Sequence, residues 1–221
     1  MALNKLKFNS LNVTPTAGKT VGFNSSANGL EATLSGGSMT FIKKLTASSS
    51  ATLSFVDGSS SVVLDNTYKE YLFTFNNIHP ATNGAAFTFQ ANASGGSGYN
   101  ETITSTQFQA YHKEDGSAAG MGYNGSNDQA QGTSFQKING NIRNDNDASG
   151  AGYLRLFNPS STTFVTNFVA YMGEPEDGSP TPLATLYTAG YFNTTAAIDE
   201  IQFKFSSGNI DSGDICLYGI S

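Results

Sequence analysis

Apolar and polar residues alternate in the last part of the chain. Between Ile201 and Phe205 every second residue is apolar and the residues between them are polar. This spacing predicts a strand with one face in a core and the other in water. After a polar break at residues 207–209, the alternation resumes from Ile215 to Ile220. The two segments predict the strand pairing that closes a β-sandwich.

Similar segments recur from residue 38 onward, separated by turn dipeptides such as Asp57-Gly58 and Asn83-Gly84. No stretch of about 15 residues carries a helical stripe, although 66–72 and 195–201 could each hold a helical turn. Residues 163–172 are apolar on both faces, which is typical of a central strand. The predicted strands are 39–45, 51–56, 69–77, 85–91, 106–112, 133–142, 152–157, 163–172, 183–192, 198–206 and 214–220.

These patterns predict an all-β protein, an antiparallel two-sheet β-sandwich of the jelly-roll kind over residues 38–221. Residues 1–37 differ, because isolated apolar residues stand in a polar, glycine-rich background. We expect an extended arm that attaches the protein to a partner. Its expected anchors are Leu3, Leu6, Phe8, Leu11 and Phe23.

Composition narrows the function classes. The 221 residues carry a net charge of -6, and Lys43-Lys44 is the only adjacent basic pair, which argues against nucleic-acid binding. No run approaches the ~20 apolar residues of a membrane span, and the first 19 residues lack the apolar stretch of a secretory signal. We therefore expect folding in a cytoplasm, with the single cysteine, Cys216, as a small core or sheet residue.

Two long polar segments, Gly116–Gly132 and Asn139–Gly152, are predicted to be loops at the rim of the sandwich. Loops of this length often bind ligands or are ordered by neighbours. In the second loop, Asp145, Asp147 and Ser149 match the first half of a calcium loop, but its twelfth position is Leu156 rather than glutamate. A solvated turn is the favoured interpretation, also for Asp211 and Asp214, and we expect no metal or cofactor.

No catalytic motif stands out. The two histidines, His79 and His112, are not accompanied by a GxSxG motif. Glu174, Glu176 and Asp177 could suggest glycoside hydrolysis. Because they lie in a proline-rich segment, we expect a solvated loop whose acids keep ordinary pKa values. No catalytic residue is assigned, and the chain is not expected to be an enzyme.

Several tyrosines could stack on sugars, because tyrosine joins an apolar ring to a polar tip. The chain has no tryptophan, which weakens a lectin-like interpretation. We expect most of these side chains in the sheets or at subunit contacts. They are Tyr99, Tyr111, Tyr123, Tyr153, Tyr187 and Tyr191.

Residues 39–220 resemble virion structural proteins of tailed bacteriophages, especially phages of marine and cyanobacterial hosts. The resemblance is carried by FIKKLTASS at 41–49, ATLSFVDG at 51–58, YKEYLFTF at 68–75, NIHP at 77–80, LRLFNPSS at 154–161 and LYGI at 217–220. It implies a jelly-roll domain of a tail fibre, a baseplate or a capsid decoration. The motifs are structural and supply no catalytic residues, and the arm lies outside the resemblance.

From these observations we expect a non-enzymatic structural protein of a tailed-phage virion, assembled in the host cytoplasm. An exposed tail appendage anchored by the arm is favoured. The alternatives are a capsid decoration protein and a carbohydrate-binding adhesin that contacts the host surface, and a hydrolase ranks last. We expect a homotrimer that contacts other virion proteins and, in the adhesin case, host glycans, with no nucleic acid and no membrane insertion.

Overall fold

The computed structural model describes residues 20–23, 26, 30–33 and 38–221. The chain divides into two compact units, Met1–Ser38 and Met39–Ser221. In the first unit, β1 (Thr20–Phe23) pairs antiparallel with β2 (Leu30–Thr33). Phe23 is 74% exposed on β1, and the other four expected anchors lie outside the described residues.

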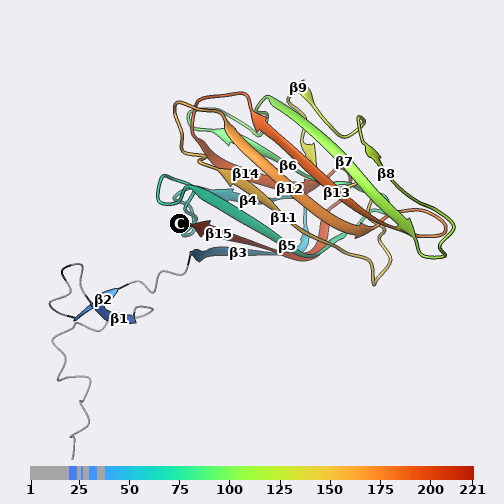
Figure 1. Cartoon of the computed structure of the whole chain (residues 1–221), viewed down its shortest axis with the longest axis horizontal. Coiled ribbons are helices and arrows are strands. Elements are labelled where there is room, and N and C mark those ends of the chain that lie inside the picture. The colour runs from blue at the N-terminus through green and yellow to red at the C-terminus, as the bar shows by residue number, and fades with distance from the viewer. Residues whose placement is uncertain (1–19, 24–25, 27–29, 34–37) are drawn as a thin grey trace, which may run out of the picture. The chain divides into compact units, whose positions relative to one another are not determined.

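The second unit consists of strands joined by turns, and the described residues contain no helix (Figure 1). No helix that could span a membrane is therefore found in this part of the chain. The strands are β3 (Met39–Ser50), β4 (Leu53–Val56), β5 (Glu70–Pro80), β6 (Phe87–Ala93), β7 (Ile103–Lys113), β8 (Ala119–Tyr123), β9 (Ala130–Gly132), β10 (Gln136–Lys137), β11 (Gly150–Phe157), β12 (Thr166–Pro175), β13 (Pro182–Phe192), β14 (Ile198–Phe205) and β15 (Ile210–Ile220).

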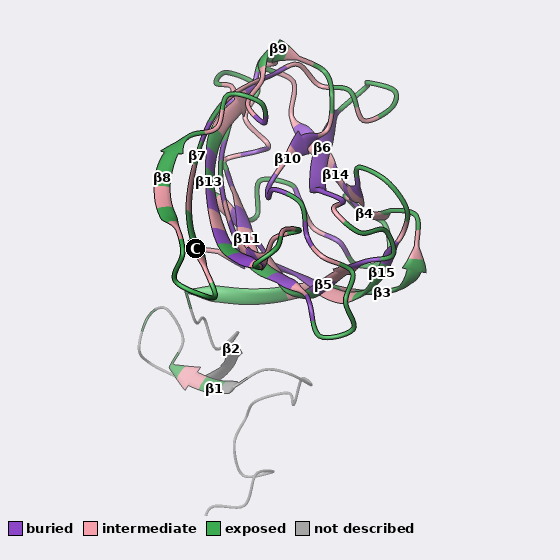
Figure 2. Ribbon diagram, turned by 90° about the vertical axis from the view of Figure 1, so that its right-hand side faces the viewer, coloured by how far each residue is buried: buried purple, intermediate pink, exposed green. Residues whose placement is uncertain are grey.

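These strands form two antiparallel sheets. The larger, nine-stranded sheet has the order β3-β15-β5-β11-β12-β13-β7-β8, with β9 also paired to β7. The smaller, four-stranded sheet has the order β10-β6-β14-β4. Figure 2 shows the larger sheet bending around the smaller one, with buried residues between them. The prediction of an all-β, two-sheet antiparallel sandwich is confirmed.

The strand order contains a complete jelly roll. Eight strands, lettered B to I in chain order, form one sheet with the order B-I-D-G and a facing sheet with the order C-H-E-F. The other strands are additions that widen the B-I-D-G sheet beyond strand G. β7, β8 and β9 are inserted between E and F, and β12 and β13 between G and H. The frame strands B to I are β3, β4, β5, β6, β10, β11, β14 and β15.

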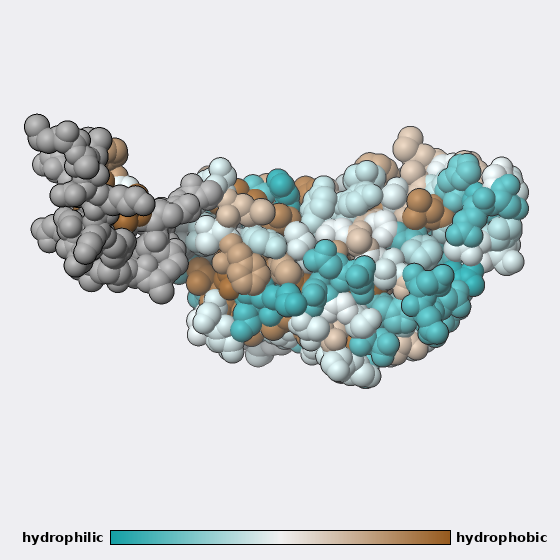
Figure 3. Space-filling model, turned by 90° about the horizontal axis from the view of Figure 1, so that it is seen from below, coloured by the Kyte–Doolittle hydropathy of each residue, from teal (hydrophilic) through white to brown (hydrophobic). Residues whose placement is uncertain are grey.

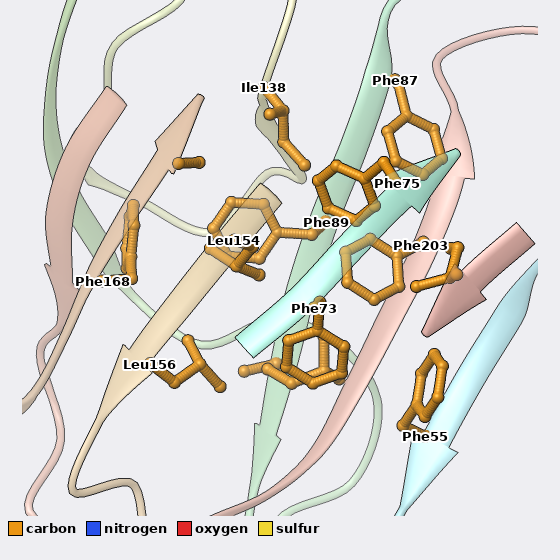
Figure 4. Close-up of a cluster of buried hydrophobic side chains, with 14 of the residues drawn as sticks. Phe55, Phe73, Phe75, Phe87, Phe89, Ile138, Leu154, Leu156, Phe168 and Phe203 are labelled. Atoms are coloured by element: carbon orange, nitrogen blue, oxygen red, sulfur yellow. The ribbon is translucent and has the colours of Figure 1, made fainter. Parts of the chain in front are cut away.

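Phenylalanine side chains fill the space between the two sheets. On β14, the buried positions Ile201, Phe203 and Phe205 alternate with partly exposed polar ones, as the sequence predicts. The Phe203 ring lies 5.3–6.5 Å, centre to centre, from no fewer than five other rings, and its nearest contacts are edge-on (Figure 4). Aromatic residues bury the largest apolar areas and prefer such geometry. The rings around Phe203 are Phe55, Phe73, Phe75, Phe87 and Phe89.

Two strand predictions need correction. Of the expected strand 133–142, only Gln136–Lys137 forms a strand and Ile142 makes isolated bridges, while the expected loop 116–132 contains β8 and β9. β8 follows a tight turn in which Gly116 N–H donates to the Lys113 carbonyl and Lys113 N–H to the Ala118 carbonyl. Its inward positions are the glycines at 120 and 122, so no apolar residue of this strand marks the core face.

The segment 163–172 contains the predicted central strand, because β12 lies between β11 and β13. Phe168 and Met172 are buried on its inner face as expected. Phe164 has the same spacing in the sequence, four residues before Phe168, which predicts a place on that face, but it is 70% exposed. It precedes the strand, in a bend where its N–H donates to the Ser161 hydroxyl at 2.8 Å. Surface hydrophobic residues of this kind also lie among polar residues on the face drawn in Figure 3.

Phe203→Ala should destabilise the protein strongly. The substitution removes the ring that contacts both sheets and leaves a cavity, at a cost of about 3–5 kcal/mol in the free energy of unfolding. Urea denaturation measures this loss. Phe164→Ala is the matched control, because its exposed ring should change the stability by less than about 0.5 kcal/mol. Equal effects of the two substitutions would contradict the assigned core.

Candidate functional site

A straight row of aromatic residues crosses the outer face of the larger sheet. Strand register places Tyr153 of β11 opposite Tyr171 of β12, and Tyr171 opposite Tyr187 of β13. Tyr187 is in turn opposite Phe108 of β7, and Phe108 is opposite Tyr123 of β8. These strands run side by side in Figure 1. We call these five residues the aromatic row.

The rings of the aromatic row contact one another. The ring centres of Tyr153 and Tyr171 are 5.8 Å apart, and those of Tyr171 and Tyr187 are 4.8 Å apart. Tyr187 and Phe108 stack with ring centres 4.9 Å apart. Exposure rises along the row, from 40% at Tyr187 to 45% at Phe108 and 65% at Tyr123. Aromatic cross-strand pairs stabilise a sheet, but here much of their surface also stays open to a partner.

The surroundings of the row are apolar and weakly charged. Val169 and Met121 lie in neighbouring outward positions, and they are 36% and 79% exposed. The nearby Arg155 is paired with Glu70, with Nη1 and Oε1 2.9 Å apart. Its guanidinium also lies 5.9 Å from the centre of the Tyr153 ring. Arg155 and Glu70 therefore balance each other, while Asp128 accepts a hydrogen bond from the Tyr123 hydroxyl at the other end of the row.

The same edge of the sheet carries a groove of about 420 Å³. Gln109 and Tyr111 of β7 line it together with residues 120–124, which include Gly120, Gly122 and Tyr123 of the aromatic row. A Cβ built on Gly120 would lie 3.0 Å from the Tyr111 ring, so that ring lies against the strand. A Cβ on Gly122 would meet nothing within 4 Å, so the space above this residue is open.

Hydrogen bonds fix the polar side chains at the groove. Ser126 Oγ donates to Asn124 Oδ1 at 2.8 Å, and Asn124 Nδ2 donates to Gln109 Oε1 at 3.1 Å. Gln109 Nε2 donates to the two carboxylate oxygens of Glu176, at 3.2 and 3.3 Å. The two amides are thereby oriented before any ligand binds.

The expectation that the acids near residue 175 are solvated is wrong for two of the three. β12 continues to Pro175, and Glu174 occupies an inward position at which it is only 1% exposed. Burial raises its pKa well above the ordinary value, and the charge of Glu176 adds to this effect. A hydrogen bond from Gly140 N–H to Glu174 Oε1, at 3.0 Å, partly opposes the shift. Asp177 is exposed, as expected.

Glu176 is half-buried, and burial raises its pKa while the hydrogen bond from Gln109 opposes the rise. Glu174 Oε2 has no hydrogen-bond partner among the described residues. A buried carboxyl group of this kind favours its neutral form. Of the two, only Glu176 is hydrogen-bonded to a residue that lines the groove.

Glu174→Gln should make stability less dependent on pH. The folded-state pKa of Glu174 lies above the unfolded value of about 4.5. Between these two pKa values the folded state keeps a proton that the unfolded state releases, so the protein loses stability as pH rises from about 4.5 to the folded-state pKa. Glutamine stays neutral and keeps an acceptor for Gly140. Urea unfolding between pH 4.5 and 8 should show the variant gaining stability over the parent as pH rises.

The matched control is Glu114→Gln, which makes the same chemical change at an exposed position. It should leave the pH dependence of stability unchanged. A difference between Glu174→Gln and the parent that is constant over this pH range would contradict the assignment of a buried neutral carboxyl group.

The two acidic turns considered for calcium meet at one cavity of about 490 Å³, lined by Asp147 and Asp211. The neighbouring carboxylates of Asp145 and Asp214 are each paired with a basic side chain. Asp145 Oδ2 lies 2.6 Å from Arg143 Nε, and Asp214 Oδ2 lies 3.1 Å from Lys44 Nζ. No group of three or more His, Cys, Asp or Glu residues in the described part of the chain is arranged to hold a metal ion.

The remaining reactive side chains are scattered over the sandwich. His79 Nδ1 lies 2.6 Å from the Ala148 carbonyl, beside the acidic cavity. His112 is exposed on β7. Cys216 is buried in β15, where the register places it between Lys44 and Thr74. The structure brings neither histidine together with Cys216.

The tyrosines singled out in the sequence reach different places. Tyr123, Tyr153 and Tyr187 belong to the aromatic row, and Tyr111 lines the groove. The Tyr99 hydroxyl donates to Glu200 Oε2 at 2.8 Å, and Tyr191 of β13 is opposite Thr104 of β7. Tyr171 and Phe108 complete the row and were missed. Their only sequence signal is a position out of phase with the core residues of their own strands.

No protein-family model matches this chain, and no significant match occurs among curated proteins or solved structures. Its function must therefore be inferred from its surfaces and its fold.

Proposed function

We propose that this chain is a non-enzymatic structural protein of a tailed-phage virion, and that it forms part of an exposed tail appendage. The observation that carries the proposal is the aromatic row on an open sheet face of a jelly roll. Its resemblance to virion proteins over residues 39–220 supports the same class. The expected attachment arm, residues 1–37, remains part of the proposal.

An exposed aromatic face of this width favours assembly. Monomeric proteins rarely expose large contiguous apolar patches, and aromatic residues are enriched where proteins meet. The row joins side chains from five neighbouring strands, and Met121 and Val169 extend it. Burying this surface against a neighbouring subunit would stabilise an assembly through the hydrophobic effect.

A second copy of the chain is the favoured neighbour. The Arg155–Glu70 pair is balanced, and Asp128 beside Tyr123 stands at one end of the row, so two like faces would repel each other only weakly. Most homo-oligomers have closed symmetry, and a trimer is the form proposed here. A capsid decoration protein would use the same surface. The groove beneath β7 and β8 favours a second function, that of an adhesin that binds carbohydrate.

Immunogold labelling of virus particles tests whether the chain is part of the tail. An antibody raised against residues 39–221 should decorate the tail of negatively stained virions of the phage that encodes the chain. Label on the head would replace the tail appendage with capsid decoration. Intact virions that carry no label, and that lack the chain by mass spectrometry, would contradict a structural role in the particle.

Phe108→Glu should weaken self-association. The substitution places a charge in the middle of the aromatic row, and burial of an unpaired charge should weaken the contact by at least about 100-fold. Light scattering coupled to gel filtration should show an oligomer for the parent chain and a smaller species for the variant.

Phe164→Glu is the matched control, because this exposed phenylalanine lies outside the row. It should leave the oligomer intact. A parent chain that is monomeric at micromolar concentration would argue against the row as a self-association surface. The same conclusion would follow if the two variants behaved alike.

A further inference from the structure

We propose that the groove between β7 and β8 binds a neutral oligosaccharide, with Tyr111 as the stacking residue and Gln109 and Asn124 as the hydrogen-bonding residues. Gln109 and Tyr111 alternate with Phe108 along β7 and so project from its other face, and Tyr123 of the aromatic row also lines the groove. This proposal does not depend on the place of the chain in a virion, because it concerns binding of a ligand by the purified chain.

The shape of the groove comes from glycine. Gly120 and Gly122 occupy the two positions of β8 at which side chains would otherwise project into it. The ring of Tyr111 covers Gly120, while the space above Gly122 is open. The volume, about 420 Å³, lies within the range of small-molecule sites. The groove can therefore take a short segment of a chain of sugar rings.

Tyr111 supplies the apolar contact. It follows the buried part of β7 and is 38% exposed, so its ring is accessible from the groove. Within the described part of the chain, no hydrogen bond engages its hydroxyl group. A ring with an apolar face and a free polar tip matches a pyranose, which has an apolar C–H face bordered by hydroxyl groups.

The two amides supply donors and acceptors at fixed positions. Gln109 Oε1 accepts one hydrogen bond from Asn124 and has a second lone pair. Asn124 Nδ2 donates that bond and has a second N–H. An acceptor and a donor side by side suit two adjacent hydroxyl groups. Because Ser126 and Glu176 already orient the amides, little entropy is lost when a ligand binds.

Charge selects a neutral ligand. No lysine or arginine lines the groove. Two carboxylates stand beside it instead, because Glu176 accepts from Gln109 and Asp128 accepts from the hydroxyl of Tyr123. Sulfated, phosphorylated or carboxylated sugars would meet repulsion there. Glu176 is a positioning residue in this scheme, since it acts through Gln109.

A glycan array probed with the full chain provides the first test. The array should present neutral di- to tetrasaccharides of hexoses and N-acetylhexosamines together with their sialylated and sulfated counterparts. We expect binding to at least one neutral glycan and weaker binding to its acidic counterparts. Binding to acidic glycans alone, or to no glycan, would overturn the proposal.

Substitutions then locate the site, with affinity for the neutral glycan measured by titration calorimetry. Gly122→Val adds a side chain where nothing lies within 4 Å, so it should fill the groove while the melting temperature is kept. Tyr111→Ala removes the stacking ring. Each variant should weaken binding by at least about tenfold, as expected for the loss of an aromatic contact.

Ala119→Val is the matched control, because Ala119 is exposed on the outer face of the same strand. It should bind like the parent chain. Unchanged affinity in folded Gly122→Val would overturn the site, and so would equal losses in Gly122→Val and Ala119→Val. Because the measurements use the purified chain, they remain decisive whether or not the antibody labels virions.

Discussion

The packing of phenylalanine side chains between the two sheets is the interaction on which the rest of the structure depends. Phe203 lies at its centre and contacts rings from β4, β5 and β6. Large apolar side chains on strands of both sheets leave few ways to stack those sheets. Once the rings are packed, the inward and outward positions of every frame strand are set. The outer surfaces, including the aromatic row, follow from that choice.

The unequal width of the sheets is the second determinant. The four-stranded sheet cannot cover all of a nine-stranded sheet, so burial declines along β7 toward its far end. Ile103 and Gln107, in the first half of β7, are buried, whereas Tyr111, near its end, is exposed. At the β7–β8 edge both faces of the sheet therefore reach solvent. One face presents aromatic rings, and the other presents a groove with glycine at its base.

Sequence reasoning predicts the fold well, because frame strands such as β14 alternate apolar and polar residues over most of their length, here from Ile201 to Phe205. β8 escapes detection, since glycine occupies its inward positions and no apolar residue marks a core-facing side. Glu174 escapes for another reason. Proline at 175 indicates a loop, but the last residues of β12 still pair with β13 and carry the carboxyl group inward.

The candidate surfaces are harder to predict than the fold. Tyr153, Tyr171 and Tyr187 are far apart in the sequence, and they form a row only because of the register between their strands. A shift of one residue would turn each ring to the opposite face. Register depends on long-range pairing and on turn geometry, which no local pattern encodes. The groove likewise requires the pairing of β7 with β8.

The strands added to the jelly roll hold most of the two candidate surfaces, and the eight-strand frame holds little of them. Four of the five residues of the aromatic row, and all the residues that line the groove, belong to the segments inserted after strands E and G. Selection on what the protein contacts can therefore act on these insertions while the eight-strand frame stays constant. The same division makes the insertions natural units for exchange between related chains, and for grafting a new specificity onto an unaltered scaffold.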